Sequence, residues 1–474
     1  MSMVVQHNMQ AANANRMLGI TSGAQAKSTE KLSSGYKINR AADDAAGLTI
    51  SEKMRKQIRG LDKASSNAQD GVSSVQTAEG ALTEVHSMLQ RMNELAVQAA
   101  NGTNSKDTDR KAIQDEVDQL TTEIDRVAET TKFNEIYLLK GDDSSTKNVY
   151  MKGHDAGLKG SLTDGAKTAT FMMDTLKEGD QYTIAGKEYT IGSAQGDLEA
   201  LIDKADKELT AAAAGTKDVE IDGKKYTLTY KAGGNTIADA DGNAVADLAT
   251  LKGKIAAGSK VTYGNTTLTA MNDVNGDGVD DDDDSIITTA VAKSKIKAEL
   301  VTANNIGTTD HAATVADGVD DAAGKTSYTI TKGYATVANT LSFNLHVGAD
   351  ADMTNKINVS IDTMNSSNLG IKNLNVTDGT GTAATYAIDA IADAVSKVSS
   401  QRSALGAVQN RLEHTIDNLD NISENTSSAE SRIRDTDMAK EMVNYSKNNI
   451  LAQAGQSMLA QANQSNQGVL SLLQ

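Results

Sequence analysis

Oxygen-bearing side chains gather in one short acidic segment near the middle of the chain. Between residues 273 and 284 they recur with the spacing of a twelve-residue calcium loop. Oxygen ligands at alternate positions converge on a hard cation, and Gly278 at the sixth position permits the sharp turn. Asp284 stands where such loops usually have Glu, and its shorter side chain reaches less readily for a two-oxygen contact. The segment is either a calcium site or a solvated acidic loop; the calcium ligands would come from Asp273, Asn275, Asp277, Val279, Asp281 and Asp284.

No pattern typical of an enzyme accompanies this segment. The six histidines are scattered, and none begins the His-Glu-x-x-His motif of a zinc peptidase. The sequence has no glycine-rich phosphate loop and no nucleophile elbow. Turn formation or helix capping explains the paired carboxylates Asp43 and Asp44 better than acid–base chemistry does. We therefore expect no catalysis and no required cofactor, with calcium in the central segment as the one candidate ion.

Charge and composition exclude several kinds of partner. The chain has 63 acidic and 46 basic residues, a net charge of −17, which argues against nucleic acid because phosphate binding needs a basic surface. No stretch approaches the roughly 18 apolar residues of a membrane span. The first residues lack the basic and apolar regions of a cleaved signal peptide. We expect no nucleic-acid binding, no membrane insertion and, if the protein is exported, a route without a cleaved signal.

Apolar residues recur with coiled-coil spacing in three long segments. Alternating steps of three and four residues predict helical seams, and the complete absence of proline favours long uninterrupted helices. Asn101-Gly-Thr ends the first seam, and a second helix is expected to begin near Ser105 or Asp107 and to run antiparallel to the first. The seams run from Ile58 to Ala99, from Ile113 to Val127 and from Ile388 to Ile422.

The middle of the chain, from about 177 to 335, is rich in Gly, Thr, Asp and Tyr. Residues 182–191 and 219–230 each read as two alternating strands joined by a tight turn, Ala-Gly in one and Asp-Gly in the other. Residues 197–209 between them read as an amphipathic helix. The predicted fold class is therefore α+β and multidomain, with long antiparallel coiled-coil helices from both termini and β-rich α+β domains inserted between them.

Both chain ends are rich in Ala, Asn, Gln and Ser, with thinly spread apolar residues. Helices with so little apolar surface are marginal alone, because most helix stability comes from packing. We expect the ends to become ordered only against each other or against neighbouring molecules. The apolar residues assigned to such assembly contacts are Val4, Val5, Leu18, Ile450, Leu451, Leu459, Leu470 and Leu473.

Five motifs, in order along the chain, carry a resemblance to bacterial flagellin, the subunit of the flagellar filament. The first is Leu-Ser-Ser-Gly-Tyr-Lys-Ile-Asn-Arg-Ala-Ala-Asp-Asp-Ala-Ala-Gly-Leu, which begins at Leu32. The others occupy residues 89–103, 131–134, 343–349 and 402–412. Motifs of this length in the right order are highly specific, and they cover the two ends of the chain, about 1–140 and 340–474.

The resemblance implies a division into three domains. An inner-core helical domain would combine residues 1–45 and 435–474. An outer-core helical domain with a small β element would combine 46–176 and 336–434. Residues 177–335 would form a variable, surface-exposed α+β insertion, with room for two subdomains.

The resemblance also implies a biology and a set of partners. Members of the family are exported unfolded without a cleaved signal, are held by an export chaperone on their carboxyl helices, and polymerise outside the cell beneath a cap. Cap and hook-junction proteins are further partners. By the same resemblance, Arg91, Leu95 and Glu116 match positions that bind the vertebrate innate flagellin receptor, while Asn93 replaces a basic residue common there. The alternatives are a hook–filament junction protein and a filament subunit with an adhesive outer domain.

Overall fold

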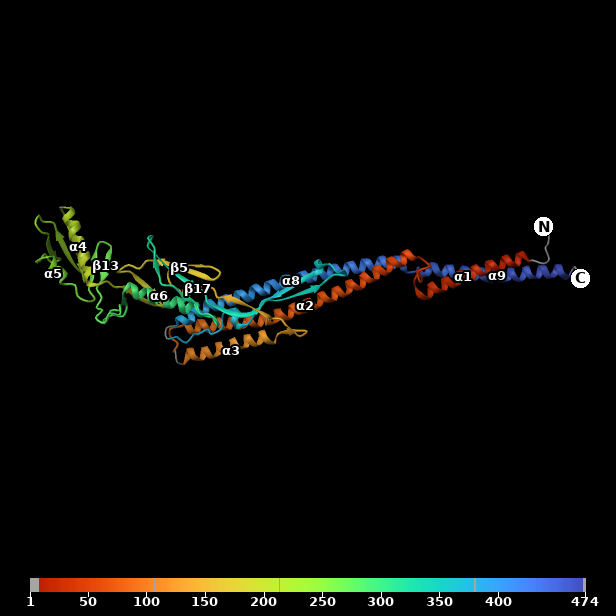
Figure 1. Ribbon diagram of the computed structural model, residues 1–474, viewed down its shortest axis with the longest axis horizontal. Coiled ribbons are helices and arrows are strands. Elements are labelled where there is room, and N and C mark those ends of the chain that lie inside the picture. Colours follow the sequence, from red (N-terminus) through yellow and green to blue (C-terminus); the bar gives the residue numbers. More distant parts are fainter. Residues whose placement is uncertain (1–7, 106–107, 213, 379–380, 472–474) are drawn as a thin grey trace. The chain divides into compact units, whose positions relative to one another are not determined.

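A computed structural model describes residues 8–105, 108–212, 214–378 and 381–471, with side chains as far as residue 465 at the carboxyl end (Figure 1). The chain divides into two compact units. One, here the terminal unit, comprises Met1–Val75, Phe343–Val359 and Ala407–Gln474. The other, the central unit, comprises Gln76–Ser342 and Ser360–Gly406. Among the described residues, no helix is long and apolar enough to cross a membrane.

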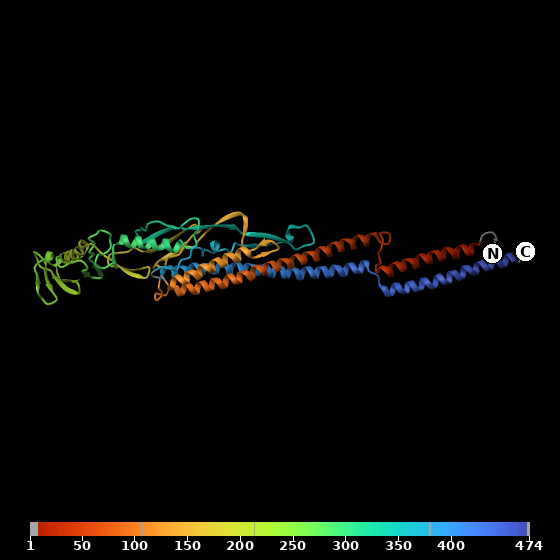
Figure 2. The same ribbon diagram turned by 90° about the horizontal axis from the view of Figure 1, so that it is seen from below.

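Four helices build the terminal unit, and two of them, α2 and α8, continue into the central unit. α1 (Met9–Ser34) and α9 (Met438–Ser471) run side by side in both views (Figures 1 and 2). They are antiparallel, because the Asn8 side-chain amide donates to the Ala462 carbonyl at 3.1 Å and Leu18 lies opposite Gly455. α2 spans Ala45–Ala100 and α8 spans Thr382–Arg434. Both lack proline, as the sequence requires for helices of this length.

The predicted seam holds α2 and α8 together in the terminal unit. Leu61, Ala64 and Leu419 form one small buried cluster. A second cluster adds a β-hairpin, β19 (Leu341–His346) and β20 (Lys356–Ile361), joined through a single 3-10 turn, η1 (Met353–Asn355). Its buried members are Ala68, Val347, Ile357 and Leu412.

Two loops meet where the terminal helix pair leaves α2 and α8. Gly35 ends α1 in the left-handed region (φ 76°), a conformation that favours glycine. The Thr436 amide donates to the Gly35 carbonyl at 2.9 Å, and the Arg434 guanidinium lies 4.8 Å from the centre of the Tyr36 ring. Asp43 and Asp44 act here as expected, since Asp43 accepts from backbone amides of the loop and Asp44 accepts from the Gly47 amide at the start of α2. The junction is thus closed mainly by backbone hydrogen bonds.

In the central unit α2 packs against α3 (Asp109–Thr130) and the first half of α8. α2 ends at Ala100, directly before the predicted Asn101-Gly stop. The seam spacing is confirmed by the burial of its members; those fully buried from all three helices are Val75, Ala78, Leu82, Val85, Leu89, Met92, Ala96, Ala99, Val117, Ile124, Ile391, Val398 and Leu405. α3 is followed in the chain by a small hairpin, β1 (Lys132–Phe133) and β2 (Ile136–Tyr137). α8 is preceded by the short helix α7 (Ser366–Leu369).

Several small sheets form one part of the strand-rich region. One core joins α6 (Thr289–Asn304) to a five-stranded and a three-stranded sheet and includes Phe171, Tyr328 and Ile296. β5 pairs with β17 along its whole length. β5 therefore belongs to the strand-rich region, although it lies before residue 177, where the composition becomes rich in Gly, Thr, Asp and Tyr. The strands, including the separate β3–β18 pair, are β3 (Asp142–Tyr150), β4 (Ser161–Asp164), β5 (Thr168–Asp174), β6 (Gln181–Ile184), β7 (Lys187–Ile191), β14 (Ile286–Ile287), β15 (Thr314–Val315), β16 (Val319–Asp320), β17 (Lys325–Thr331) and β18 (Tyr334–Asn339).

A second core lies under a six-stranded sheet, covered on one face by α4 (Gln195–Ala212) and α5 (Leu248–Lys252). Its strand order is β11-β10-β9-β8-β12-β13. Both predicted hairpins are confirmed, and both turns have two consecutive positive φ values: 51° and 79° at Ala185-Gly186, 51° and 76° at Asp222-Gly223. That geometry matches the twist of the flanking strands. The bounds are β8 (Thr216–Ile221), β9 (Lys224–Thr229), β10 (Thr236–Asp239), β11 (Ala244–Val245), β12 (Lys260–Tyr263) and β13 (Thr266–Thr269).

Candidate functional site

The contact between α1 and α9 is a coiled-coil seam made of small and polar side chains. Its half-buried positions recur at steps of three and four on each helix, yet only Ser28 among them is buried. A seam of alanines, a glycine and amide or hydroxyl side chains removes little apolar area from water, so it stabilises the pair weakly. Its members are Ala11, Ala14, Leu18, Thr21, Gln25 and Ser28 on α1, and Tyr445, Asn448, Ala452, Gly455, Leu459 and Ala462 on α9.

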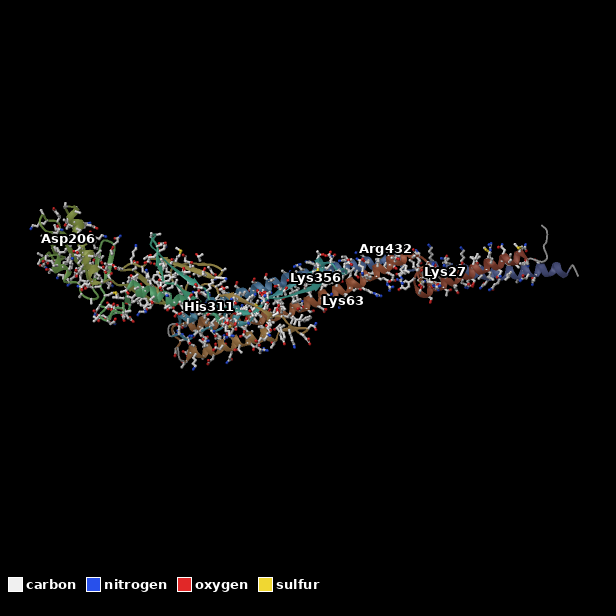
Figure 3. All side chains as sticks on the ribbon, in the orientation of Figure 1. Lys27, Lys63, Asp206, His311, Lys356 and Arg432 are labelled. Atoms are coloured by element: carbon white, nitrogen blue, oxygen red, sulfur yellow. The ribbon has the colours of Figure 1, made fainter. Side chains whose placement is uncertain are left out.

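Most of the larger apolar side chains described on the two helices lie outside this seam and are exposed. Ile450 is 66% exposed and Leu451 is 47% exposed. Scattered single apolar residues are ordinary on a protein surface, but a row of them along a weakly held helix pair marks a surface that another molecule can cover. Polar residues lie between them; Lys27 on α1, labelled in Figure 3, reaches Asp43 at 3.9 Å. The other exposed members are Met9, Met17, Ile20, Met438, Met442, Val443 and Met458.

A groove of about 700 Å³ runs between the two helices. Met17 from α1 and Met458 from α9 line it, and Ala14 and Gly455 are among its small lining residues. A Cβ atom at Gly455 would lie 3.4 Å from a Leu18 methyl group, which is an ordinary van der Waals contact. The groove was not predicted from the sequence, although small residues at seam spacing are a signal that could have indicated it.

The predicted assembly residues fall into three groups. Ile450 and Leu451 lie on the exposed side of α9, as an assembly role requires. Leu18 and Leu459 are half-buried in the seam, so they hold α1 and α9 together instead of facing outward. Val4, Val5 and Leu473, and the side chain of Leu470, lie outside the described residues.

The residues matched to the innate receptor lie in the central unit, on α2 and α3. The Arg91 guanidinium donates to Glu116 at 2.8 Å and to Glu94 at 3.1 Å, and these bonds hold the pKa of Arg91 above its usual value. Arg91 and Glu116 are exposed enough to touch a partner. Leu95 is only 2% exposed, so it offers little surface for a partner to contact.

The geometry of the acidic loop does not gather its predicted calcium ligands. Asp273 accepts hydrogen bonds from the amides of Gly276 and Gly278, and Asp281 accepts from Val274 and Asn275. Asp284 forms an ion pair with Lys187 at 2.8 Å.

The buried carboxylate of the loop is Asp280, which the spacing argument passed over and which accepts from three backbone amides. Among the residues that the structure describes, no group of three or more acidic or histidine side chains is placed to hold a metal ion. Calcium binding stays a prediction, and calorimetry of the full chain with calcium tests it.

A chain whose two ends form one weakly held helix pair, followed by long coiled-coil helices, is by its architecture a helical structural subunit. Two family models match it: the bacterial flagellin N-terminal helical region over residues 5–144, and the bacterial flagellin C-terminal helical region over residues 388–473. A flagellin of Clostridium tyrobutyricum is 40% identical over 470 residues, which cover 98% of this chain and 100% of that protein. The chain belongs to the bacterial flagellin family, and it is a component of the flagellar filament.

Other relatives agree along the whole length. The flagellin of Bacillus subtilis is 35% identical over 472 residues, covering 99% of this chain and 100% of its own. The solved structure of FliC from Burkholderia pseudomallei is 20% identical and covers 72% of this chain and 99% of that one, with a TM-score of 0.26. That superposition is too loose to support an argument. The sequence relatives carry the family assignment.

Proposed function

We propose that the chain is exported from the bacterial cell and polymerises with copies of itself into the filament that drives motility. The observation that carries this proposal is the α1–α9 pair, whose seam is small and polar while Ile450 and Leu451 face solvent. Burial of these outer side chains between subunits supplies the apolar contact that the isolated pair lacks. The subunit therefore stays soluble until it meets a growing filament end.

Truncation tests this mechanism. Removing residues 438–474 deletes α9 and one side of the groove, so the truncated chain should not polymerise. The seams of α2, α3 and α8 lie outside the deletion and should keep the remainder folded, which circular dichroism checks. Electron microscopy after precipitant-induced assembly should show long filaments for the full chain and none for the truncation. Filaments grown from the truncated chain would refute the mechanism.

The same microscopy separates filament subunit from hook–filament junction protein. A filament subunit elongates without limit from short seeds, whereas a junction protein forms only short structures. Glycan binding by the strand-rich region would favour the adhesive alternative.

Export and assembly imply further partners. The weakly held α9 is the segment that an export chaperone would cover before secretion, since its outer apolar side chains are exposed in the free chain. Cap and hook-junction proteins would meet the subunit outside the cell. Sequencing the amino ends of the secreted protein and of the protein inside the cell tests export without a cleaved signal: the two ends should be the same, and a shorter end on the secreted protein would contradict it.

The surface formed by Arg91 and Glu116 is proposed as a ligand for the vertebrate innate flagellin receptor. Its support is the exposed ion pair between α2 and α3, which presents charged groups on a rigid helical surface. Substituting Arg91→Ala should weaken receptor signalling about tenfold or more, because charge-assisted contacts at an interface centre are costly to lose.

Arg126→Ala is the matched control for this substitution. Arg126 lies on α3 in a similarly exposed pair with Glu123, away from the Arg91 surface in sequence. A reporter-cell assay should show full signalling for Arg126→Ala. Equal losses in both variants would contradict a specific role for Arg91.

A further inference from the structure

Thioether sulfurs are concentrated on the outer surface of the terminal helix pair. Of the large apolar side chains exposed on α1 and α9, a majority are methionines, and Met17 and Met458 are 55% and 62% exposed. Elsewhere several methionines are buried in cores, such as Met92 on α2 and Met173 on β5. The exposed members on the pair are Met9, Met17, Met438, Met442 and Met458.

Two of these methionines lie on opposite sides of one groove. Met17 comes from α1 and Met458 from α9, with small residues such as Ala14 and Gly455 also lining the groove. Methionine is flexible and polarisable, so it adapts to an irregular partner surface and makes close contacts there. A groove with methionines from both helices is suited to an apolar side chain of a second subunit.

The same exposure makes these sulfurs reactive. A peroxide transfers one oxygen atom to a thioether: the S–O bond forms as the O–O bond breaks, and sulfur is oxidised by two electrons. The departing hydroxide takes the proton of the transferred oxygen and leaves as water. The product, methionine sulfoxide, is polar, and burying it disrupts methionine-rich interfaces. Access of oxidant to sulfur governs which residues react, so the exposed set should react before the buried one.

We propose that these five methionines, above all Met17 and Met458, are an oxidant-sensitive modification site whose conversion to sulfoxide blocks addition of the free subunit to the filament. The proposal rests on the proposed function, because the sulfurs must be buried between subunits for their oxidation to matter. In the free chain they face solvent. An oxidant of the peroxide class thereby controls the pool of subunits able to assemble.

The test treats the free full-length chain with hydrogen peroxide, locates sulfoxides by peptide mass spectrometry, and then measures polymerisation. Sulfoxide should appear at the exposed methionines, these five among them, before it appears at the buried ones. The critical concentration for polymerisation should rise by about tenfold or more, because a polar group is then buried without a partner. For a variant with all five changed to Leu, the critical concentration should be the same with and without peroxide treatment.

Met172→Leu with Met353→Leu is the matched control, since both residues are exposed but lie off the terminal helix pair. That control should stay as sensitive as the original chain. An oxidised chain that polymerises at the original concentration overturns the proposal, as does equal sensitivity of the five-Leu variant.

Two further readouts keep the outcome decisive. If the five-Leu variant does not polymerise even without oxidant, treating the oxidised original chain with a methionine sulfoxide reductase decides: recovery supports the proposal, and no recovery overturns it. A failure of the oxidation proposal gives a different result from a failure of the proposed self-assembly function. In that case the untreated chain forms no filaments, and Met17 and Met458 gain no protection from peroxide when subunits are mixed under assembly conditions.

Discussion

At the scale of single residues, one buried guanidinium holds the end of α2. Arg110 is 1% exposed, and it donates to the carbonyls of Ala99 at 2.8 Å, Asp378 at 2.7 Å and Asn101 at 3.2 Å. Two of these carbonyls belong to the last turn of α2 and the residue after it, where intrahelical donors run out and a positive charge is favourable. Arg110 thus joins the helix end to the segment that leads into α8.

Replacing Arg110 should be costly. Arg110→Met keeps a long apolar stem but removes the donor from the carbonyls of Ala99 and Asp378 and one of two donors from that of Asn101, so the free energy of unfolding should fall by about 3 kcal/mol. Urea unfolding of the monomeric chain measures the change. Arg126→Met, on the exposed side of α3, should change it by less than about 0.5 kcal/mol, because exposed ion pairs contribute little. Similar losses in the two variants would show that burial of Arg110 is not what matters.

A half-buried carboxylate should make stability depend on acid pH. Burial by itself raises the pKa of Asp362, but hydrogen bonds from Thr340 at 2.5 Å and Lys147 at 2.9 Å outweigh it, so its pKa lies below 3.8. The folded chain therefore holds this proton less tightly than the unfolded chain. The carboxylate's contribution is fully present above the unfolded pKa and is lost as pH falls through the folded pKa.

Asp362→Asn should expose this contribution. The variant should be less stable at neutral pH and should lose less stability than the original chain between about pH 5 and pH 2, because one acid-sensitive contact is gone. Thermal unfolding across that range is the measurement. Asp115→Asn, at an exposed position on α3, should leave the pH profile unchanged. An Asp362→Asn profile parallel to the original would contradict the assignment.

Residue types and spacing predicted the roles of single residues less well than they predicted helices and strands. The spacing from Asp273 to Asp284 gives the types and positions of the candidate ligands. Backbone amides of the loop and Lys187 bind the same carboxylate oxygens. The sequence alone does not show which of these interactions forms. Leu95 lies beside the α2 seam by heptad counting. It is nevertheless 2% exposed, because tertiary packing buries it and heptad counting along one helix does not specify that packing. Arg110 reads as a surface residue near the start of α3 and proves to be among the most buried side chains.

At the scale of elements, two glycines of α2 allow the effect of packing on stability to be distinguished from the effect of helix propensity. A Cβ atom at Gly60 would lie 2.9 Å from the Ala349 side chain and 3.1 Å from its Cα, whereas nothing lies within 4 Å of one at Gly80. Alanine favours a helix over glycine by roughly 0.5–1 kcal/mol. Gly80→Ala should therefore stabilise the chain by about that amount.

Gly60→Ala should have the opposite sign. Its new methyl group meets a backbone that must move, and overpacking of this kind costs about 1–3 kcal/mol. Comparing the urea midpoints of the two variants makes each the control for the other. Equal stabilisation by both substitutions would mean that the loop at Ala349 yields freely.

The long helices and the tight hairpins are the elements that the sequence predicts best. Seam spacing located the buried stripe of α2 from Leu61 to Ala99, and the turn signals Ala185-Gly186 and Asp222-Gly223 located both hairpins. These features depend on local periodicity and on backbone conformations that few residues adopt. Pairing between distant strands, such as β5 with β17, has no comparable local signal.

At the scale of the whole molecule, the two ends of the chain bury little apolar area against each other. Leu18 and Leu459 are the large aliphatic residues of the α1–α9 seam, while Ile450 and Leu451 face outward. A subunit built in this way gains most of its remaining apolar contact from other copies. We therefore propose that the outer face of the terminal helix pair drives self-assembly.

The most direct test of that claim is the critical concentration for polymerisation of the Ile450→Asn, Leu451→Asn double variant, measured by sedimentation and electron microscopy. Val319→Asn is the control, since Val319 is 65% exposed, close to the 66% of Ile450, but lies on β16, off the terminal pair. The account predicts that the double variant keeps its helical circular dichroism yet stays monomeric, while Val319→Asn forms filaments like the original chain. Filaments from the double variant at the original critical concentration would contradict it.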